Sequence, residues 1–131
     1  MNLSELKEKL KFLKKDKEII AVLLFGSYLT NREYSRDIDI CLVLDKKYQN
    51  KEMTKKRLYS CTVLPSKFDV QVFQQLPLYI RKRILEKNKI IFCKDEDKFY
   101  EIVINTLKEY NLFEKAYRYY MDSIKNEGKN N

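Results

Sequence analysis

The sequence predicts an α+β fold, in which a short β-sheet is flanked by helices and followed by a long C-terminal helix. Two short runs, residues 19–25 and 38–44, consist mainly of branched apolar side chains, which is typical of buried strands. A third run, residues 68–73, alternates between apolar and polar side chains as a half-buried strand does. From Asp95 onward, apolar residues recur at three- and four-residue steps without glycine or proline until Gly128, which indicates one long helix.

The chain begins with an amphipathic helix over residues 3–15. Its leucines recur at three- and four-residue steps, Asn2 is available as the N-terminal cap, and Glu5 lies in the first turn. A charged turn follows, and the first strand then ends at Gly26.

Three more elements are expected between the second strand and the long helix. The charged segment 50–60 has the spacing of a helix, and another helix begins at residues 76–77 and continues to Asn88, because proline is tolerated in a first turn. Residues 89–93 form a brief strand of the edge type. The terminal helix from Asp95 has about 30 residues and a length of roughly 45 Å, so part of it must project from the body or pack on something else.

The composition excludes several kinds of chemistry. The 131 residues contain no histidine, which excludes histidine bases, Ser-His and Cys-His pairs and histidine-ligated zinc. The three cysteines lack CxxC spacing and lie among apolar residues, as expected of buried, reduced thiols in the cytoplasm. No apolar run approaches the ~20 residues that span a bilayer, so a soluble protein with a single domain-sized core is expected.

The chain is basic, with 27 Lys and Arg against 19 Asp and Glu and a formal net charge of +8. This balance suits polyanionic partners, but the lysines are spread along the whole chain, so a solvated Lys-rich surface is the favoured explanation. The basic runs 55–57 and 81–83 are interpreted in the same way, as solvated helix faces. Direct binding of nucleic acid is therefore not expected.

Three aspartates lie at or near strand positions. Because side chains alternate along a strand, Asp37 and Asp39 point to one face while Ile38 and the alternate apolar residues point into the core. Asp69 on the third strand adds a third carboxylate. Since carboxylates within apolar strands cost stability unless a cation or partner satisfies them, we expect Asp37, Asp39 and Asp69 to bind Mg²⁺, with two ions held between them.

The turn between the first two strands has the features of a phosphate-binding loop. Gly26 lacks a β-carbon, so the backbone can approach a triphosphate closely, and Ser27 offers a hydroxyl and an amide to phosphate oxygens. Arg32 and Arg36 in the following loop are further candidates for contact with the triphosphate. Asp69 is the candidate base that accepts the proton of an attacking hydroxyl.

The pattern Gly26-Ser27, nine intervening residues, Asp37-Ile38-Asp39 and a later Asp69 resembles the polymerase-beta-like nucleotidyltransferase superfamily. Within that superfamily the chain looks most like the minimal nucleotidyltransferases, the antitoxin partners of HEPN-domain toxins, over residues 3–95. The resemblance implies a short mixed sheet and Mg²⁺-dependent transfer of AMP from ATP to a protein hydroxyl. It also implies that the acceptor is a tyrosine of a HEPN ribonuclease toxin, which makes this chain the antitoxin.

The loop departs from the pattern of the minimal nucleotidyltransferases at two positions. Tyr28 fits the aromatic position that follows Gly-Ser, but Thr30 stands where these proteins commonly have arginine and Asn31 where they have a second glycine. Asparagine tolerates a left-handed backbone better than most residues, so the turn itself is expected to form.

Two units are expected, a nucleotidyltransferase domain over residues 1–94 and a helical extension over residues 95–131. The aromatic content of the extension suits an interface, either with a partner protein or in a homodimer, and packing of the helix on its own body is an equal alternative. A second function is therefore an antitoxin that neutralises its partner by contact alone. A third is nucleotide transfer to a small molecule. The shortness of the chain is an argument against this function, because no second domain is expected that could enclose such a substrate.

Overall fold

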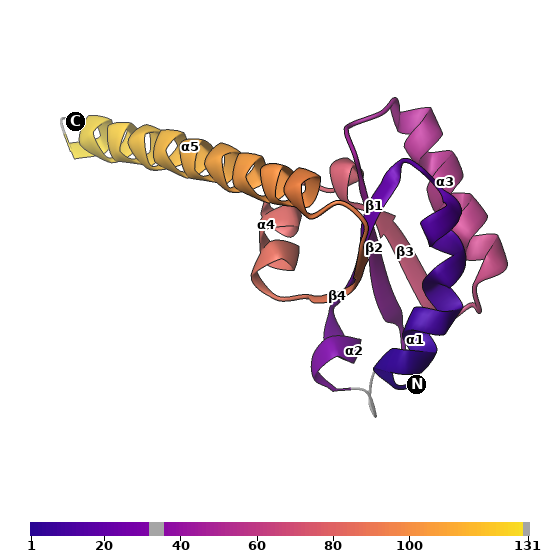
Figure 1. Ribbon diagram of the computed structural model, residues 1–131. Coiled ribbons are helices and arrows are strands. Elements are labelled where there is room, and N and C mark those ends of the chain that lie inside the picture. Colours follow the sequence, from indigo (N-terminus) through magenta and orange to yellow (C-terminus); the bar gives the residue numbers. More distant parts are fainter. Residues whose placement is uncertain (32–35, 130–131) are drawn as a thin grey trace.

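The structure is a computed structural model, and it describes residues 1–31 and 36–129. The elements follow one another as α1 (Leu3–Leu10), η1 (Lys11–Lys15), β1 (Ile19–Phe25), α2 (Ser27–Thr30), β2 (Ile38–Leu44), α3 (Asn50–Val63), β3 (Phe68–Val72), η2 (Phe73–Gln75), α4 (Leu78–Glu86), β4 (Lys89–Cys93) and α5 (Glu96–Lys129), η1 and η2 being 3-10 helices. The predicted α+β fold with a long C-terminal helix is confirmed (Figure 1).

The four strands form one mixed sheet in the order β3-β2-β1-β4. β1 runs antiparallel to both β2 and β4, whereas β2 and β3 are parallel. The strand at residues 89–93 is at an edge of the sheet, as predicted. The parallel pair aligns Asp39 with Asp69, which puts two of the three predicted carboxylates on neighbouring positions.

Helices cover both faces of the sheet (Figure 1). α1 and α3 lie over one face and bury a large cluster that includes Leu6, Ile40 and Met53. α4 and the start of α5 lie over the other face, where Cys41 and Phe99 belong to a second cluster. β2 is therefore buried on both sides. Asp39 is its one polar residue, and all the other residues of the strand are buried.

The first predicted helix ends earlier than expected. α1 begins as predicted, because the Asn2 side chain accepts a hydrogen bond from the backbone N–H of Glu5 at 2.8 Å. After Leu10 the chain tightens into η1, which still buries Leu13 against the sheet. The leucine spacing thus identified the buried face but not the change of helix type.

The basic run at residues 55–57 is not simply a solvated face. Lys56 Nζ lies 2.6 Å from Asp16 Oδ2 and 2.8 Å from Glu18 Oε2, and it joins α3 to the turn before β1. Arg57 Nε donates a hydrogen bond to the carbonyl of Val70 on edge strand β3 at 3.0 Å. Both interactions fasten α3 to the sheet.

The three cysteines are free thiols, as expected, but they are not all buried. Cys41 is fully enclosed within the sheet, Cys93 is half-buried, and Cys61 is exposed on α3. Within residues 1–31 and 36–129, no helix combines the length and the apolar character needed to cross a membrane.

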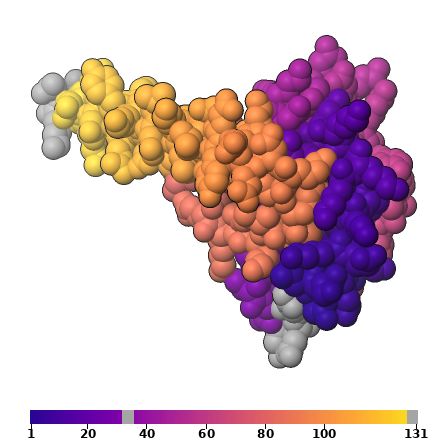
Figure 2. All heavy atoms as spheres, in the orientation of Figure 1, coloured from indigo at the N-terminus to yellow at the C-terminus, as the bar shows by residue number. Residues whose placement is uncertain are grey.

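α5 contains 34 residues, which corresponds to roughly 51 Å. Its first turns pack on the body through Phe99, Ile102 and Val103. Further along, Glu109 faces Arg81 at 3.6 Å, and the Lys82 ammonium lies 4.5 Å from the centre of the Tyr110 ring. The rest of the helix projects away from the body, which is one of the two outcomes expected for a helix of this length (Figures 1 and 2).

Candidate active site

The end of β1 approaches β2 so closely that only glycine fits at position 26. Gly26 has φ 78° and ψ −163°, a backbone conformation that is essentially reserved for glycine. A β-carbon here would lie 2.1 Å from Asp39 Oδ2, because Phe25 pairs with Asp39 across the two antiparallel strands. The glycine of the loop and the second aspartate of the pair therefore occupy interlocking positions.

The structure brings the three predicted aspartates together. Asp39 on β2 aligns with Asp69 on β3, and Asp37 lies just before β2 on the same side as Asp39 by strand alternation. Partial burial raises the pKa of Asp39, and the negative charges of Asp69 and then Asp37 raise it further. Asp39 is thus close enough to both other carboxylates to be repelled by their charges.

The donor set fits a hard divalent cation. Across the part of the chain that the structure describes, no group of three His, Cys, Asp or Glu side chains, the three predicted aspartates included, is placed to hold a metal ion. Mg²⁺ does not need three protein carboxylates, because proteins usually hold it through one or two carboxylates together with substrate phosphates. The repulsion around Asp39 is of the kind that a bound cation relieves.

Asp69 is exposed, and its orientation is supported by a neighbour on the same strand. Gln71 Nε2 donates a hydrogen bond to Asp69 Oδ1 at 3.1 Å. Because Gln71 is two residues along β3, its side chain lies on the same face as Asp69.

α2 carries Ser27 at its start and is held against the N-terminal segment. The Tyr28 side chain is buried, and its hydroxyl donates a hydrogen bond to the carbonyl of Met1 at 2.7 Å. The turn ends with the Asn31 N–H bonded to the carbonyl of Ser27 at 2.8 Å. Asn31 has φ −148°, so the left-handed conformation considered for this position is not used.

A cavity of about 520 Å³ opens beside the Gly26-Ser27 turn. The end of β1 and α2 form one wall, and α4 forms the other. The residues that line it are Phe25, Gly26, Ser27, Thr30, Ile80, Arg83, Ile84, Glu86 and Lys87. Its volume lies in the range of small-molecule sites in proteins.

The α4 contribution was missed by the sequence interpretation, which placed residues 81–83 on a solvated face. Arg81 and Lys82 are engaged in ion pairs, with Glu109 and Glu86 respectively, and only Arg83 of the three lines the cavity. A run of three basic residues carries no signal that separates these roles, because the assignment depends on how α4 packs on α5.

The structure describes only one of the two loop arginines that were candidates for contact with the triphosphate. Arg36 is exposed just before Asp37 and does not line the cavity. Arg32 lies outside the described residues.

Comparisons with known proteins agree on the family and on the fold. The family model described as "Polymerase beta, Nucleotidyltransferase" matches residues 7–97. A protein of Methanocaldococcus jannaschii, provisionally named a protein adenylyltransferase, is 39% identical over 77 residues. That match covers 57% of this chain and spans 57% of the relative's length.

Two solved structures share the overall fold at low sequence identity. One is a tri-AMPylated Shewanella oneidensis HEPN toxin in complex with an MNT antitoxin, with a TM-score of 0.67 and 15% identity over 94% of this chain and 98% of that chain. The other is a toxin-antitoxin structure with AMP-PNP, with a TM-score of 0.67 and 16% identity over 95% of this chain and 98% of that chain. The likeness extends over almost the whole length, so the long terminal helix is part of the shared fold.

Proposed function

This chain belongs to the polymerase beta nucleotidyltransferase family, and we propose that it transfers AMP from ATP to a hydroxyl group of a partner protein. The observation that carries the proposal is the clustering of three carboxylates beside a glycine turn. Asp39 is coupled electrostatically to Asp37 and Asp69, and its carboxylate lies directly beneath Gly26.

The proposed roles of the residues follow from their chemistry. Gly26 and Ser27 contact the triphosphate through backbone and hydroxyl groups, and Arg36 is a further candidate for that contact. Asp37, Asp39 and Asp69 would hold Mg²⁺, in two positions. When bound, Mg²⁺ neutralises phosphate charge and lowers the pKa of the attacking hydroxyl.

Asp69 serves as the base in this proposal. Its carboxylate takes the proton of the acceptor hydroxyl while the hydroxyl oxygen forms a bond to the α-phosphorus. The bond from the α-phosphorus to the bridging oxygen breaks, and pyrophosphate leaves with that electron pair. The hydrogen bond from Gln71 supports this role by fixing the direction of the Asp69 carboxylate.

We further propose that the partner is a HEPN-domain toxin and the acceptor one of its tyrosines, so that the chain acts as an antitoxin in the cytoplasm. The support is the fold shared with MNT antitoxins, one of them in complex with an AMPylated HEPN toxin. In this proposal residues 1–94 form the catalytic unit, and residues 95–131 form an extension that contributes to the core at its start and contacts a partner further along.

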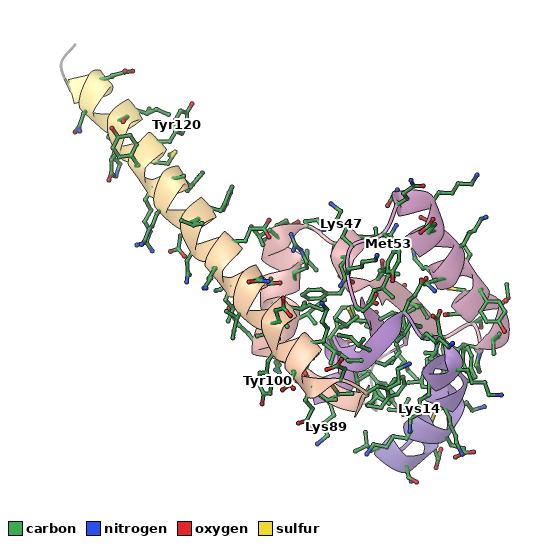
Figure 3. The ribbon with its side chains drawn as sticks, turned by 45° about the horizontal axis from the view of Figure 1, so that its top comes forward. Lys14, Lys47, Met53, Lys89, Tyr100 and Tyr120 are labelled. Atoms are coloured by element: carbon green, nitrogen blue, oxygen red, sulfur yellow. The ribbon has the colours of Figure 1, made fainter. Side chains whose placement is uncertain are left out.

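Neutralisation by contact alone remains a second candidate. The observation that favours it is the projecting half of α5, where Figure 3 shows Tyr120 standing clear of the body. Large apolar side chains are exposed along this half, namely Leu112, Phe113, Tyr117, Tyr119, Tyr120, Met121 and Ile124.

The test is transfer of label from α-labelled ATP in the presence of Mg²⁺ and the product of a neighbouring HEPN-type gene. The parent chain should label the partner on tyrosine, and Asp37→Asn or Asp39→Asn should reduce the rate at least about 100-fold. Asp97→Asn, an exposed carboxylate at the start of α5, is the matched control and should leave the rate unchanged. Labelling that survives in both site variants would contradict the catalytic proposal, and binding of the partner without labelling would favour contact alone.

A further inference from the structure

Four basic residues lie on or directly after α4, and they divide into two pairs with different surroundings. Arg81 faces Glu109 and donates a hydrogen bond to the carbonyl of Leu76 at 3.1 Å. Lys82 faces Glu86 and lies over the Tyr110 ring. These two cations therefore hold α4 to α5 and to its own last turn.

Arg83 and Lys87 form the second pair. Arg83 lies on α4 and Lys87 directly follows the helix, and both line the cavity beside Gly26 and Ser27. Their side chains are exposed, and the salt bridges found across residues 1–31 and 36–129 include neither of them.

The cavity is electropositive on its α4 side. Glu86 also lines it, but its Oε1 lies 2.5 Å from Lys82 Nζ, so its charge is already compensated. Cations near a helix C-terminus are favoured by the helix dipole in any protein, so the position on α4 alone has no functional meaning. The informative feature is that both free cations face the same space as the Gly26-Ser27 turn.

We propose that Arg83 and Lys87 bind the phosphate groups of the nucleoside triphosphate from the α4 side of this cavity. The inference rests on the proposed function, and it assigns charge recognition to residues outside the motif. The cavity lining supports this assignment, because Thr30 on the loop side carries no charge and Arg83 and Lys87 are the only basic residues among the described residues that line the cavity. The apolar wall of Phe25, Ile80 and Ile84 leaves room for the nucleoside beside the phosphates.

The test is equilibrium binding of ATP, AMP and adenosine, with Mg²⁺, to the parent chain and to Arg83→Gln/Lys87→Gln. The double variant should lose ATP affinity by about tenfold or more, AMP affinity by less, and adenosine affinity not at all, because the lost contacts are to charged oxygens. Lys89→Gln is the matched control, since Lys89 is an exposed lysine two residues further on that does not line the cavity. Lys87→Arg keeps the charge and should keep the affinity for ATP.

The possible failures are distinguishable. Equal affinity of the parent and the double variant for ATP overturns this inference and leaves the proposed function standing, as does an equal loss for ATP and adenosine. A double variant that binds ATP normally but no longer labels the partner also overturns it, because the two cations would then face the acceptor. A parent chain that binds no ATP overturns the inference and the proposed function together.

Discussion

At the scale of single residues, Gly26 and Asp39 constrain each other, because any side chain at position 26 would collide with the Asp39 carboxylate. Gly26→Ala forces alanine into the backbone conformation of Gly26, which costs a residue with a β-carbon about 1–3 kcal/mol. The added β-carbon also collides with the Asp39 carboxylate. We therefore expect the free energy of unfolding, measured with urea, to fall by at least about 2 kcal/mol in this variant. The variant should also lose ATP binding.

A double variant separates the two causes. In an Asp39→Ala background the carboxylate is gone, so Gly26→Ala should cost only the backbone share, about 1 kcal/mol less than in the parent. Equal costs in both backgrounds would show that the close approach of the two residues is unimportant.

The raised pKa of Asp39 makes stability depend on pH. The folded state binds this proton more tightly than the unfolded chain, whose carboxyl titrates near 3.8. The free energy of unfolding therefore falls as the pH rises from that value through the folded pKa, and the whole cost is present at neutral pH.

Asp39→Asn removes this cost, so we expect a gain of up to about 1 kcal/mol at pH 7 without divalent ions, because the half-exposed site is screened by solvent. The gain should vanish below pH 3.8, where the parent carboxyl is protonated in both states. Thermal unfolding from pH 3 to pH 8 measures it. Addition of Mg²⁺ should stabilise the parent more than the variant, and the reverse order would argue against a metal at Asp39.

At the scale of elements, Gln74 in η2 completes the sheet where β3 ends. Its Nε2 donates to the carbonyl of Leu44 at 2.8 Å, and its Oε1 accepts from the Leu44 N–H at 3.1 Å, so one side chain replaces a strand partner. Gln74→Ala leaves both backbone groups without these bonds and should cost about 1–3 kcal/mol in urea unfolding. Gln75→Ala, whose bonds to α3 are partly exposed, is the control and should cost less.

The two halves of α5 should respond differently to change. Phe99 is only 9% exposed and belongs to the cluster between α5 and the sheet, so Phe99→Ala should cost about 3 kcal/mol. Ending the chain after Asn111 removes no residue of either buried cluster and should shift the melting temperature by only a few degrees. A large loss of stability in the shortened chain would show that the projecting half folds back on the body in solution.

At the scale of the whole molecule, we expect the projecting half of α5 to be the surface for assembly. If the chain acts as proposed, the form ending at Asn111 should still bind ATP but should lose its complex with the partner protein in size-exclusion chromatography with light scattering. A full-length chain that is dimeric alone and becomes monomeric on truncation would instead assign this surface to self-association.

The sequence predicted the strands well because their signals are local. β1 and β2 have the predicted bounds, since apolar runs bounded by Gly26 and by charged turns leave little choice. The strand at residues 68–73 is one residue too long in the prediction. Phe73 directly follows the apolar Val72 and so breaks the alternation, and it begins η2, where it is buried in the cluster on the other face of the sheet.

The site could be predicted in its parts but not in its assembly. Its carboxylates and glycine were identified from spacing, whereas the alignment of Asp39 with Asp69 depends on a parallel pairing that no local pattern specifies. The roles of Arg83 and Lys87 depend on which cations α5 engages, and that is a property of tertiary packing.

The anchored helix also has a mechanical consequence. Residues 112–129 extend about 27 Å beyond the body, so a tilt of ~5° about the anchored turns moves the free end by roughly 2 Å. A load at that end would act as torque on Arg81 and Lys82, the side chains that fasten α4 to α5. Because Lys82 also pairs with Glu86 at the cavity wall, we expect binding at the free end of α5 to change the cavity beside the proposed nucleotide.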